Sequence, residues 1–208
     1  MHAMGLSLAI VVAALAVALA LRPWRALRAD GVLQPWLACL VLLPWVWAAR
    51  RVMPGGVSVQ LSGACLLVLM VGWPLAVLSL LPIAAIGAWL GGIAWPQALD
   101  HLAWNGMMAA TLALSIGLAT RRWLPHHPFV FILGRGFIVT ALAMMAAGTM
   151  SAYVQPPPES TELGSVLLGH WLMAWGEAFS TGMLVAIFVA FKPEWLATWS
   201  DARYLPKD

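Results

Sequence analysis

Residues 163–191 read LGSVLLGHWLMAWGEAFSTGMLVAIFVAF, an apolar run that contains two ionisable side chains, His170 and Glu177. A helix needs about 20 mostly apolar residues to cross the hydrocarbon core of a bilayer. This run exceeds that length. Its apolar residues are continuous rather than alternating, so it predicts a membrane-spanning helix and not a strand of a membrane barrel.

The rest of the chain has the same character. Its residues are 62% hydrophobic and 9% charged, whereas soluble domains carry roughly 25% charged residues. Six further apolar segments precede the quoted run, at about Ala3–Leu21, Leu33–Ala49, Val57–Gly72, Pro74–Trp95, Leu99–Ala119 and Phe129–Tyr153. The sequence therefore predicts an all-α, polytopic integral membrane protein with about seven transmembrane helices. Residues 1–191 form a single membrane domain in this prediction, and residues 192–208 form a C-terminal tail.

Two of the predicted segments are short for a full crossing. These are Leu33–Ala49 and Val57–Gly72. A span of about 20 residues is the usual requirement. Either segment is therefore expected to be tilted, interfacial or only partly inserted.

The basic residues predict the orientation. Cytoplasmic loops are enriched in Lys and Arg. If the N-terminus lies outside and the C-terminus inside, most of the basic residues lie on the cytoplasmic side: Arg22, Arg25, Arg28, Arg121, Arg122, Lys192, Arg203 and Lys207. Arg50 and Arg51 oppose this assignment. No basic residue precedes the first apolar run, so it is expected to be a retained helix rather than a cleaved signal. The predicted location is the inner membrane of a bacterial cell.

Several function classes lack support in the sequence. The net charge of +3 comes from residues near helix ends, and no basic stripe with interleaved aromatic residues indicates nucleic-acid binding. Cys39 and Cys65 lie within apolar segments, which favours buried thiols over a metal pair. Neither a His-Glu-x-x-His motif nor a Gly-x-Ser-x-Gly motif is present, so the chain is not expected to be an enzyme.

The polar residues that remain at membrane depth are functional candidates, because burying an ionisable group in lipid is expensive. Gln60 begins the third segment from outside, and His101 opens the fifth. His170 and Glu177 are seven residues apart, so both project from one face of the last helix. Glu177 must be paired, protonated or facing a cavity, and a purely structural hydrogen-bonding role is the alternative for it.

The chain opens with Met1-His2. A free α-amine, a backbone amide and the imidazole of residue 2 together form a chelate for one metal ion. Planar nitrogen ligation of this kind favours Ni(II) or Cu(II). The N-terminus is therefore the most specific candidate site in the sequence.

Four places in the chain resemble the energy-coupling factor (ECF) transporter permeases of the CbiM/NikM type, which capture cobalt or nickel for uptake. They are Met1-His2, the stretch from Val57 to Pro74, the pair Gly91-Gly92, and the stretch from His170 to Gly182. The resemblance implies a divergent branch of that group. Its transported substrate would be a divalent transition metal, nickel or cobalt, with no organic cofactor.

The resemblance also implies a ligand set and partners. It assigns the Met1 amine and His2 as metal ligands. In those permeases a histidine stands just before the Leu-Ser-Gly stretch, whereas this chain has Gln60 there. His101, His170 and Glu177 are therefore further metal-ligand candidates. Separate ATPase subunits and a transmembrane coupling protein would drive release, because the chain has no Gly-x-x-x-x-Gly-Lys-Ser/Thr motif.

Three other functions stay open at this stage. A b-type haem protein would use His101 and His170 as axial ligands. A membrane assembly factor would bind no ligand, and an intramembrane enzyme would need chemistry from generic residues beside Glu177. Divalent-metal uptake is the leading prediction.

Overall fold

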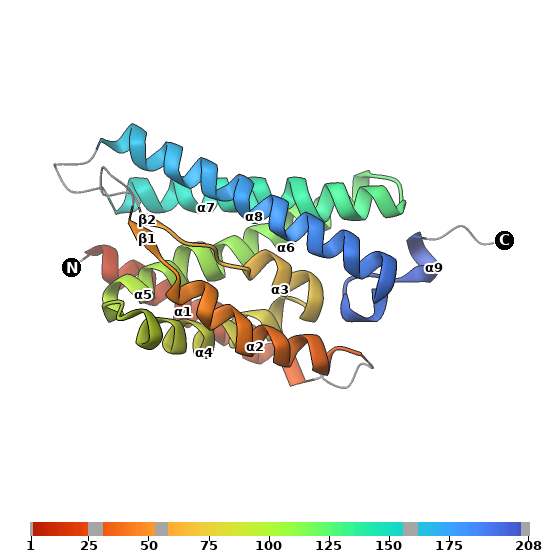
Figure 1. Ribbon diagram of the computed structural model, residues 1–208, viewed down its shortest axis with the longest axis horizontal. Helices are drawn as coiled ribbons and strands as arrows, with labels where there is room; N and C mark the ends of the chain where they lie inside the picture. Colours follow the sequence, from red (N-terminus) through yellow and green to blue (C-terminus); the bar gives the residue numbers. More distant parts are fainter. Residues whose placement is uncertain (1, 25–30, 53–57, 156–161, 205–208) are drawn as a thin grey trace.

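The computed structural model describes residues 2–24, 31–52, 58–155 and 162–204. It confirms an all-α, polytopic architecture, in which long apolar helices run side by side (Figure 1). In the described part of the chain, four continuous helices are long and apolar enough to cross a membrane: Trp73–Gly91, Trp95–Trp123, Val130–Val154 and Leu163–Phe191. Two shorter apolar helices accompany them, α1 (His2–Ala20) and α2 (Leu33–Ala48).

Two of the long helices contain π-helical turns. The fifth predicted segment consists of α5 (Trp95–His101), the π-helix η2 (Leu102–Met108) and α6 (Ala109–Trp123). The sixth consists of the π-helix η3 (Val130–Ile138) and α7 (Val139–Val154). Such turns leave some backbone carbonyls without their ordinary helical partner and often occur at functional sites. The first and last of the long helices, α4 (Trp73–Gly91) and α8 (Leu163–Phe191), are α-helical throughout.

The third predicted segment differs from a simple span. It begins as the short strand β2 (Ser58–Val59), which pairs antiparallel with β1 (Arg51–Val52). The chain then runs without regular structure to Gly63, and helix α3 (Ala64–Val71) follows. Gly63 and Gly72 flank this helix with φ of 67° and 78°, values that favour glycine. Continuous hydropathy over Val57–Gly72 therefore does not correspond to one helix, and only its second half is helical.

Every residue of α3 is buried within the protein. The C-terminal segment, which includes η4 (Pro193–Trp195) and α9 (Asp201–Tyr204), packs against the end of this helix. The Ala197 and Thr198 N–H groups donate to Met70 O (3.0 Å) and Leu69 O (3.3 Å), respectively. These bonds satisfy carbonyls that a helix end leaves free. The described part of the predicted tail is thus attached to the membrane domain.

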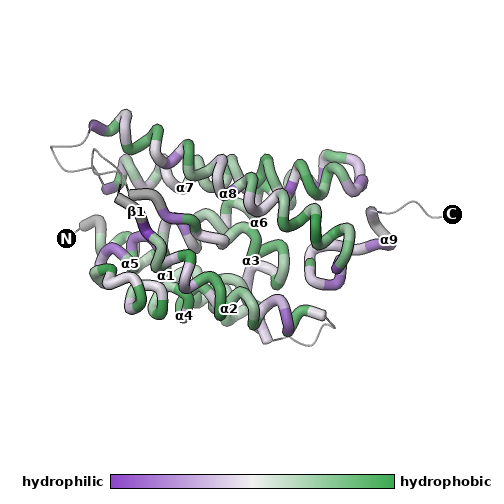
Figure 2. Tube along the Cα trace, in the orientation of Figure 1, coloured by the Kyte–Doolittle hydropathy of each residue, from purple (hydrophilic) through white to green (hydrophobic). Residues whose placement is uncertain are grey.

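The two ends of the bundle carry different connections. α1 begins at the end that holds the β1–β2 pair, and α9 lies at the opposite end (Figure 1). An odd number of crossings places the two ends of a chain in this way. Hydrophilic residues gather at both ends and beside β1, whereas hydrophobic residues follow the helices between them (Figure 2). The N-outside orientation remains a prediction, and we call the end with β1 and β2 the outer end.

Small residues bring the continuous helix formed by η3 and α7 close to α8. A Cβ added at Gly136 would lie 3.2 Å from Val185 Cβ, and one added at Gly182 would lie 3.2 Å from Phe137 Cβ. Ala147 and Ala174 are buried without exposed surface in the same region. Helices in membranes associate through such close packing, because lipid offers no hydrophobic driving force between them.

Candidate functional site

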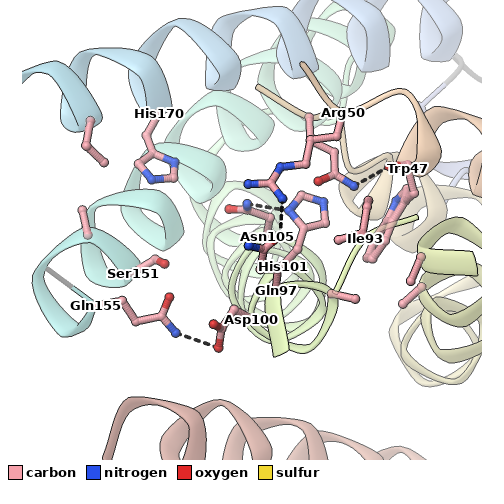
Figure 3. A pocket seen from close by; sticks show the side chains of 16 residues that line it. Trp47, Arg50, Ile93, Gln97, Asp100, His101, Asn105, Ser151, Gln155 and His170 are labelled. Atoms are coloured by element: carbon pink, nitrogen blue, oxygen red, sulfur yellow. Dashed lines mark hydrogen bonds between the residues drawn. The ribbon is translucent and has the colours of Figure 1, made fainter. Parts of the chain in front are cut away.

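A cavity of about 260 Å³ lies near the outer end of the bundle. Residues from α2, the non-helical segment before α3, α4, α5, η2, α7 and α8 line it (Figure 3). Its walls carry two histidines, five carboxamide or hydroxyl side chains beyond them, one arginine and one aspartate: His101, His170, Gln60, Gln97, Asn105, Ser151, Gln155, Arg50 and Asp100. A polar cavity within an apolar bundle is the default location for a binding site.

His101 occupies the inner wall of this cavity. Its Nδ1 atom lies 2.9 Å from Asn105 Nδ2, one helical turn further along the same helix. The Trp47 ring packs edge-on against the imidazole, with ring centroids 4.6 Å apart. Among the described residues, His101 Nε2 is buried without a hydrogen-bond partner. A buried polar nitrogen without a partner is unfavourable, so the imidazole carries an unsatisfied polar atom at this wall.

A smaller hollow of about 40 Å³ continues the cavity inward. It shares Gln60, His101, Asn105 and His170 with the larger cavity and adds two thioethers, Met144 and Met173. Figure 3 shows His101 and His170 on facing walls. Imidazole nitrogen and thioether sulfur are ligands for late transition metals, whereas Mg²⁺ and Ca²⁺ prefer oxygen.

The outer rim of the cavity is held by hydrogen bonds between distant segments. Ser7 Oγ donates to Asp100 Oδ1 (2.7 Å), and Gln155 Nε2 donates to the same oxygen (2.8 Å). Asp100 thereby joins the outer turns of α1 and α7 to α5. On another side, Arg50 Nη1 donates to Gln97 Oε1 (2.6 Å). The N-terminal part of α1 is thus fixed beside the cavity.

The non-helical segment that carries Gln60 is fixed by bonds from three helices. Trp47 Nε1 donates to Ser62 O (2.8 Å), and Gln60 Nε2 donates to Trp47 O (2.6 Å). Ser62 Oγ donates to Asn105 O (2.8 Å), a carbonyl in the π-helical stretch η2. Irregular backbone is tolerated at membrane depth when the protein supplies such partners.

Glu177 completes this set of bonds. The Ser62 N–H donates to Glu177 Oε2 (2.9 Å), and the Gly63 N–H donates to Glu177 Oε1. The side chain of Glu177 is 2% exposed. The carboxylate therefore caps the start of α3 from α8, in the way that an acidic side chain stabilises the N-terminus of a helix.

The predicted metal ligands fall into three groups in the structure. Gln60, His101 and His170 line one cavity together. Glu177 does not line it and is bonded to the backbone of residues 62 and 63. Met1 lies outside the described residues, and His2 is the first residue of α1. Within the described ranges, no three His, Cys, Asp or Glu side chains are grouped closely enough to hold a metal ion.

Arg50 and Asn105 are two of the cavity residues that were not predicted as site residues. The sequence marks Arg50 only as an exception to the expected distribution of basic residues, and that exception was the available signal for it. Asn105 lies four residues after His101, at the spacing of one helical turn. A carboxamide at this spacing from a membrane histidine indicates that both side chains lie on one face of the helix, and this was the available signal for Asn105.

His170 is held against a glycine of α7. A Cβ added at Gly148 would lie 2.8 Å from Cγ and Nδ1 of His170, closer than side chains pack. Gly148→Ala is therefore expected to displace the imidazole and to lower the free energy of unfolding by about 1–3 kcal/mol, as overpacked substitutions do. Thermal unfolding of the detergent-purified protein measures this change.

The matched control is Gly164→Ala on α8, where an added Cβ meets nothing within 4 Å. Alanine favours helix over glycine by roughly 1 kcal/mol, so this variant should be unchanged or slightly more stable. Equal stability of the Gly148 and Gly164 variants would contradict the close contact with His170.

A known protein family matches most of the chain. The family model described as "Cobalt uptake substrate-specific transmembrane region" matches residues 2–195. No curated protein and no solved structure matches the chain significantly. The match extends over the helices that build the cavity.

Proposed function

Because the chain belongs to the CbiM family and is a membrane component of cobalt uptake, we propose that its outer cavity captures a divalent metal ion for import. The observation that carries this proposal is the convergence of Gln60, His101 and His170 on one polar cavity in an apolar bundle. Nickel is the second metal that the donor set suits, since nitrogen ligands bind Ni(II) more strongly than Co(II).

The proposed ligands combine the N-terminus with the cavity. The Met1 amine and the His2 imidazole supply nitrogen donors at the start of α1, a helix whose Ser7 is bonded to Asp100 at the rim. Gln60 Nε2 donates a hydrogen bond to Trp47 O. The Oε1 atom of Gln60 is therefore the one proposed to face a ligand. An amide oxygen is a harder donor than imidazole, so His101 and His170 are the better replacements for the histidine that Gln60 substitutes.

Glu177 serves the site indirectly in this proposal. Its carboxylate holds residues 62 and 63, and Gln60 lies two residues before them. Residues that orient ligands from behind can change metal affinity by about 10–100-fold. Glu177 is therefore proposed as a positioning residue.

Release into the cell requires an energy source outside this chain, because the sequence has no phosphate-binding loop of the Walker type. We propose separate ATPase subunits and a coupling protein as partners. Helix α3 is the element best placed to respond to them. It begins at the segment that carries Gln60 and ends against residues 197 and 198 at the other end of the bundle.

Metal binding at different pH values tests the proposal. Imidazole and amine donors must lose their protons to bind a metal, so affinity should fall as the pH decreases through the range where histidine titrates, near 6.5. Equilibrium dialysis of the purified protein with a native N-terminus should give one Co(II) per chain at pH 7.5. At pH 5.5 the affinity should be lower than at pH 7.5 by about tenfold or more.

The N-terminal residue is verified by mass spectrometry in the same preparation. Absence of bound Co(II) and Ni(II) at every pH, in protein that remains folded, would contradict metal capture by this chain. Binding that is strong and independent of pH would contradict nitrogen ligation.

A further inference from the structure

Arg135 is a charged side chain buried inside the bundle. It lies on the π-helix η3, within the sixth membrane segment, and is 8% exposed. A guanidinium remains charged in proteins, so its burial is costly unless an anion compensates the charge. Within the described ranges, the ion pair that lies within 4 Å joins Lys192 to Glu194, and no described carboxylate pairs with Arg135. The Phe131 ring, with its centroid 5.3 Å from Arg135 Cζ, compensates the charge only in part.

The packing around Arg135 leaves its guanidinium at the walls of two small hollows. One, of about 80 Å³, lies between η3, α3, α6 and the C-terminal segment, and the other, of about 10 Å³, has Tyr204 of α9 in its wall. The guanidinium lies against Gly117 of α6, where an added Cβ would be 3.5 Å from Arg135 Nε. Nε is the guanidinium nitrogen that is buried without a partner among the described residues, so we assign contact with a ligand to the two Nη atoms.

The smaller hollow lies at the end of the bundle that holds α9, which we call the inner end (Figure 1). Of the described residues that line it, Arg121 and Arg135 are positively charged and none is negatively charged. His126 and Tyr204 add groups that can form further hydrogen bonds. Two guanidinium groups at one hollow suit a phosphate, because their planar sets of N–H donors match its oxygen atoms.

The surroundings of this hollow favour a lipid as the source of the phosphate. Leu124 forms part of its wall and is exposed, as are Trp123 and Phe129. An exposed tryptophan at the end of a membrane helix is typical of the headgroup level of a bilayer. Acyl chains would cover these apolar side chains, whereas a free phosphate would leave them uncovered. Basic pockets between membrane helices are known to bind anionic headgroups.

From these features we propose that the inner end binds an anionic phospholipid, with its phosphate contacted by the guanidinium groups of Arg135 and Arg121. A hollow of about 10 Å³ admits about one water-sized group, so one phosphate oxygen enters it and the rest of the headgroup lies at its rim. The site is separate from the metal-capture cavity and does not rest on the proposed function. It is also independent of the predicted orientation, because both surfaces of a bilayer carry phosphate headgroups.

Thermal unfolding of delipidated, full-length protein in a neutral detergent tests the proposal. Separate samples receive phosphatidylglycerol, phosphatidylcholine or inorganic phosphate. Phosphatidylglycerol at about a hundredfold above its Kd should raise the unfolding midpoint by about 5–10 °C, because it binds the folded state. Phosphatidylcholine with the same acyl chains has no net charge and should give a smaller shift. A shift with inorganic phosphate as large as that with phosphatidylglycerol would overturn the lipid as the source.

Variants locate the phosphate. Arg135→Gln and Arg121→Ala should each lower the affinity for phosphatidylglycerol by about tenfold or more, the effect of losing one charge-assisted hydrogen bond. Arg121 is exposed, so its variant is expected to fold even if Arg135→Gln does not. The matched control is Arg122→Ala, which removes a neighbouring exposed arginine that does not line the hollow. It should bind the lipid like the original protein, and equal affinities of the Arg121 and Arg122 variants would contradict the site.

Asp208→Asn tests a rival counter-charge from the end of the chain, since Asp208 is the acidic residue among residues 205–208, which follow Tyr204. This variant should bind phosphatidylglycerol like the original protein. If it is destabilised and the lipid has no effect on the original protein, Asp208 supplies the counter-charge and the proposal is wrong. If no lipid affects any folded form, the proposal is equally wrong, and the two arginines are left to an acidic group of a partner chain.

Discussion

Glu177→Ala is expected to lower the free energy of unfolding by about 3–6 kcal/mol, because it removes the shared acceptor of two buried backbone N–H groups. Each hydrogen bond to a charged group contributes roughly 1.5–3 kcal/mol, and a buried donor left without an acceptor adds its own penalty. The two donors belong to Ser62 and Gly63. The total stability of a typical domain is about 5–15 kcal/mol, so this loss is a large fraction of it.

The free energy of unfolding of Glu177→Gln should lie between those of the original protein and Glu177→Ala. Its single amide oxygen can accept from one N–H group, but its amide nitrogen would face the other donor. We expect a loss of about 2–3 kcal/mol, which corresponds to one charged hydrogen bond. Thermal unfolding followed by size-exclusion chromatography in detergent measures both variants.

The control Glu162→Ala removes an exposed carboxylate just before α8, where it makes no capping bond. Surface substitutions of this kind change stability by about 0.5 kcal/mol or less. If Glu177→Ala unfolds like the control but loses bound cobalt, the carboxylate is a metal ligand and the capping role assigned here is wrong.

His2→Ala is the second prediction with a large effect, an expected decrease in Co(II) or Ni(II) affinity of at least about a hundredfold. The substitution removes the imidazole that closes the proposed chelate with the Met1 amine and the intervening amide. Losing an orienting residue behind a ligand already lowers affinity by 10–100-fold, so loss of a ligand should exceed that range. Equilibrium dialysis with protein of verified N-terminal mass provides the measurement.

His127→Ala is the matched control, since His127 is exposed in the connection between α6 and η3. It should bind metal like the original protein. Equal affinities of the His2 and His127 variants would remove the N-terminus from the ligand set, and the site would then depend on His101 and His170 alone.

The fold class could be predicted because hydropathy reports directly on membrane burial. Long apolar runs such as Leu163–Phe191 became helices with the expected ends. Hydropathy does not distinguish a helix from an extended chain that the protein itself surrounds. Residues 57–72 were therefore predicted as one apolar segment, whereas the structure holds a strand, an irregular stretch and an eight-residue helix.

The candidate site was predictable in part. Polar residues at membrane depth are conspicuous in an apolar sequence, so Gln60, His101 and His170 could be selected before their proximity was known. The partner of Glu177 could not be found, because residues 62 and 177 are 115 positions apart and the contact involves backbone N–H groups. Arg50 was interpreted only through topology, and its place in the cavity depends on the packing of five helices.

The capping of α3 by Glu177 also constrains the order in which the protein can be assembled. A ribosome delivers Ser62 and Gly63 to the membrane well before it delivers α8, which contains the acceptor of their N–H groups. Unpaired backbone groups are poorly tolerated in lipid. The third segment is therefore expected to stay near the interface or against neighbouring helices, without its final structure, until α8 has been inserted. A chain that stops before α8 would leave the N–H groups of Ser62 and Gly63 without this acceptor.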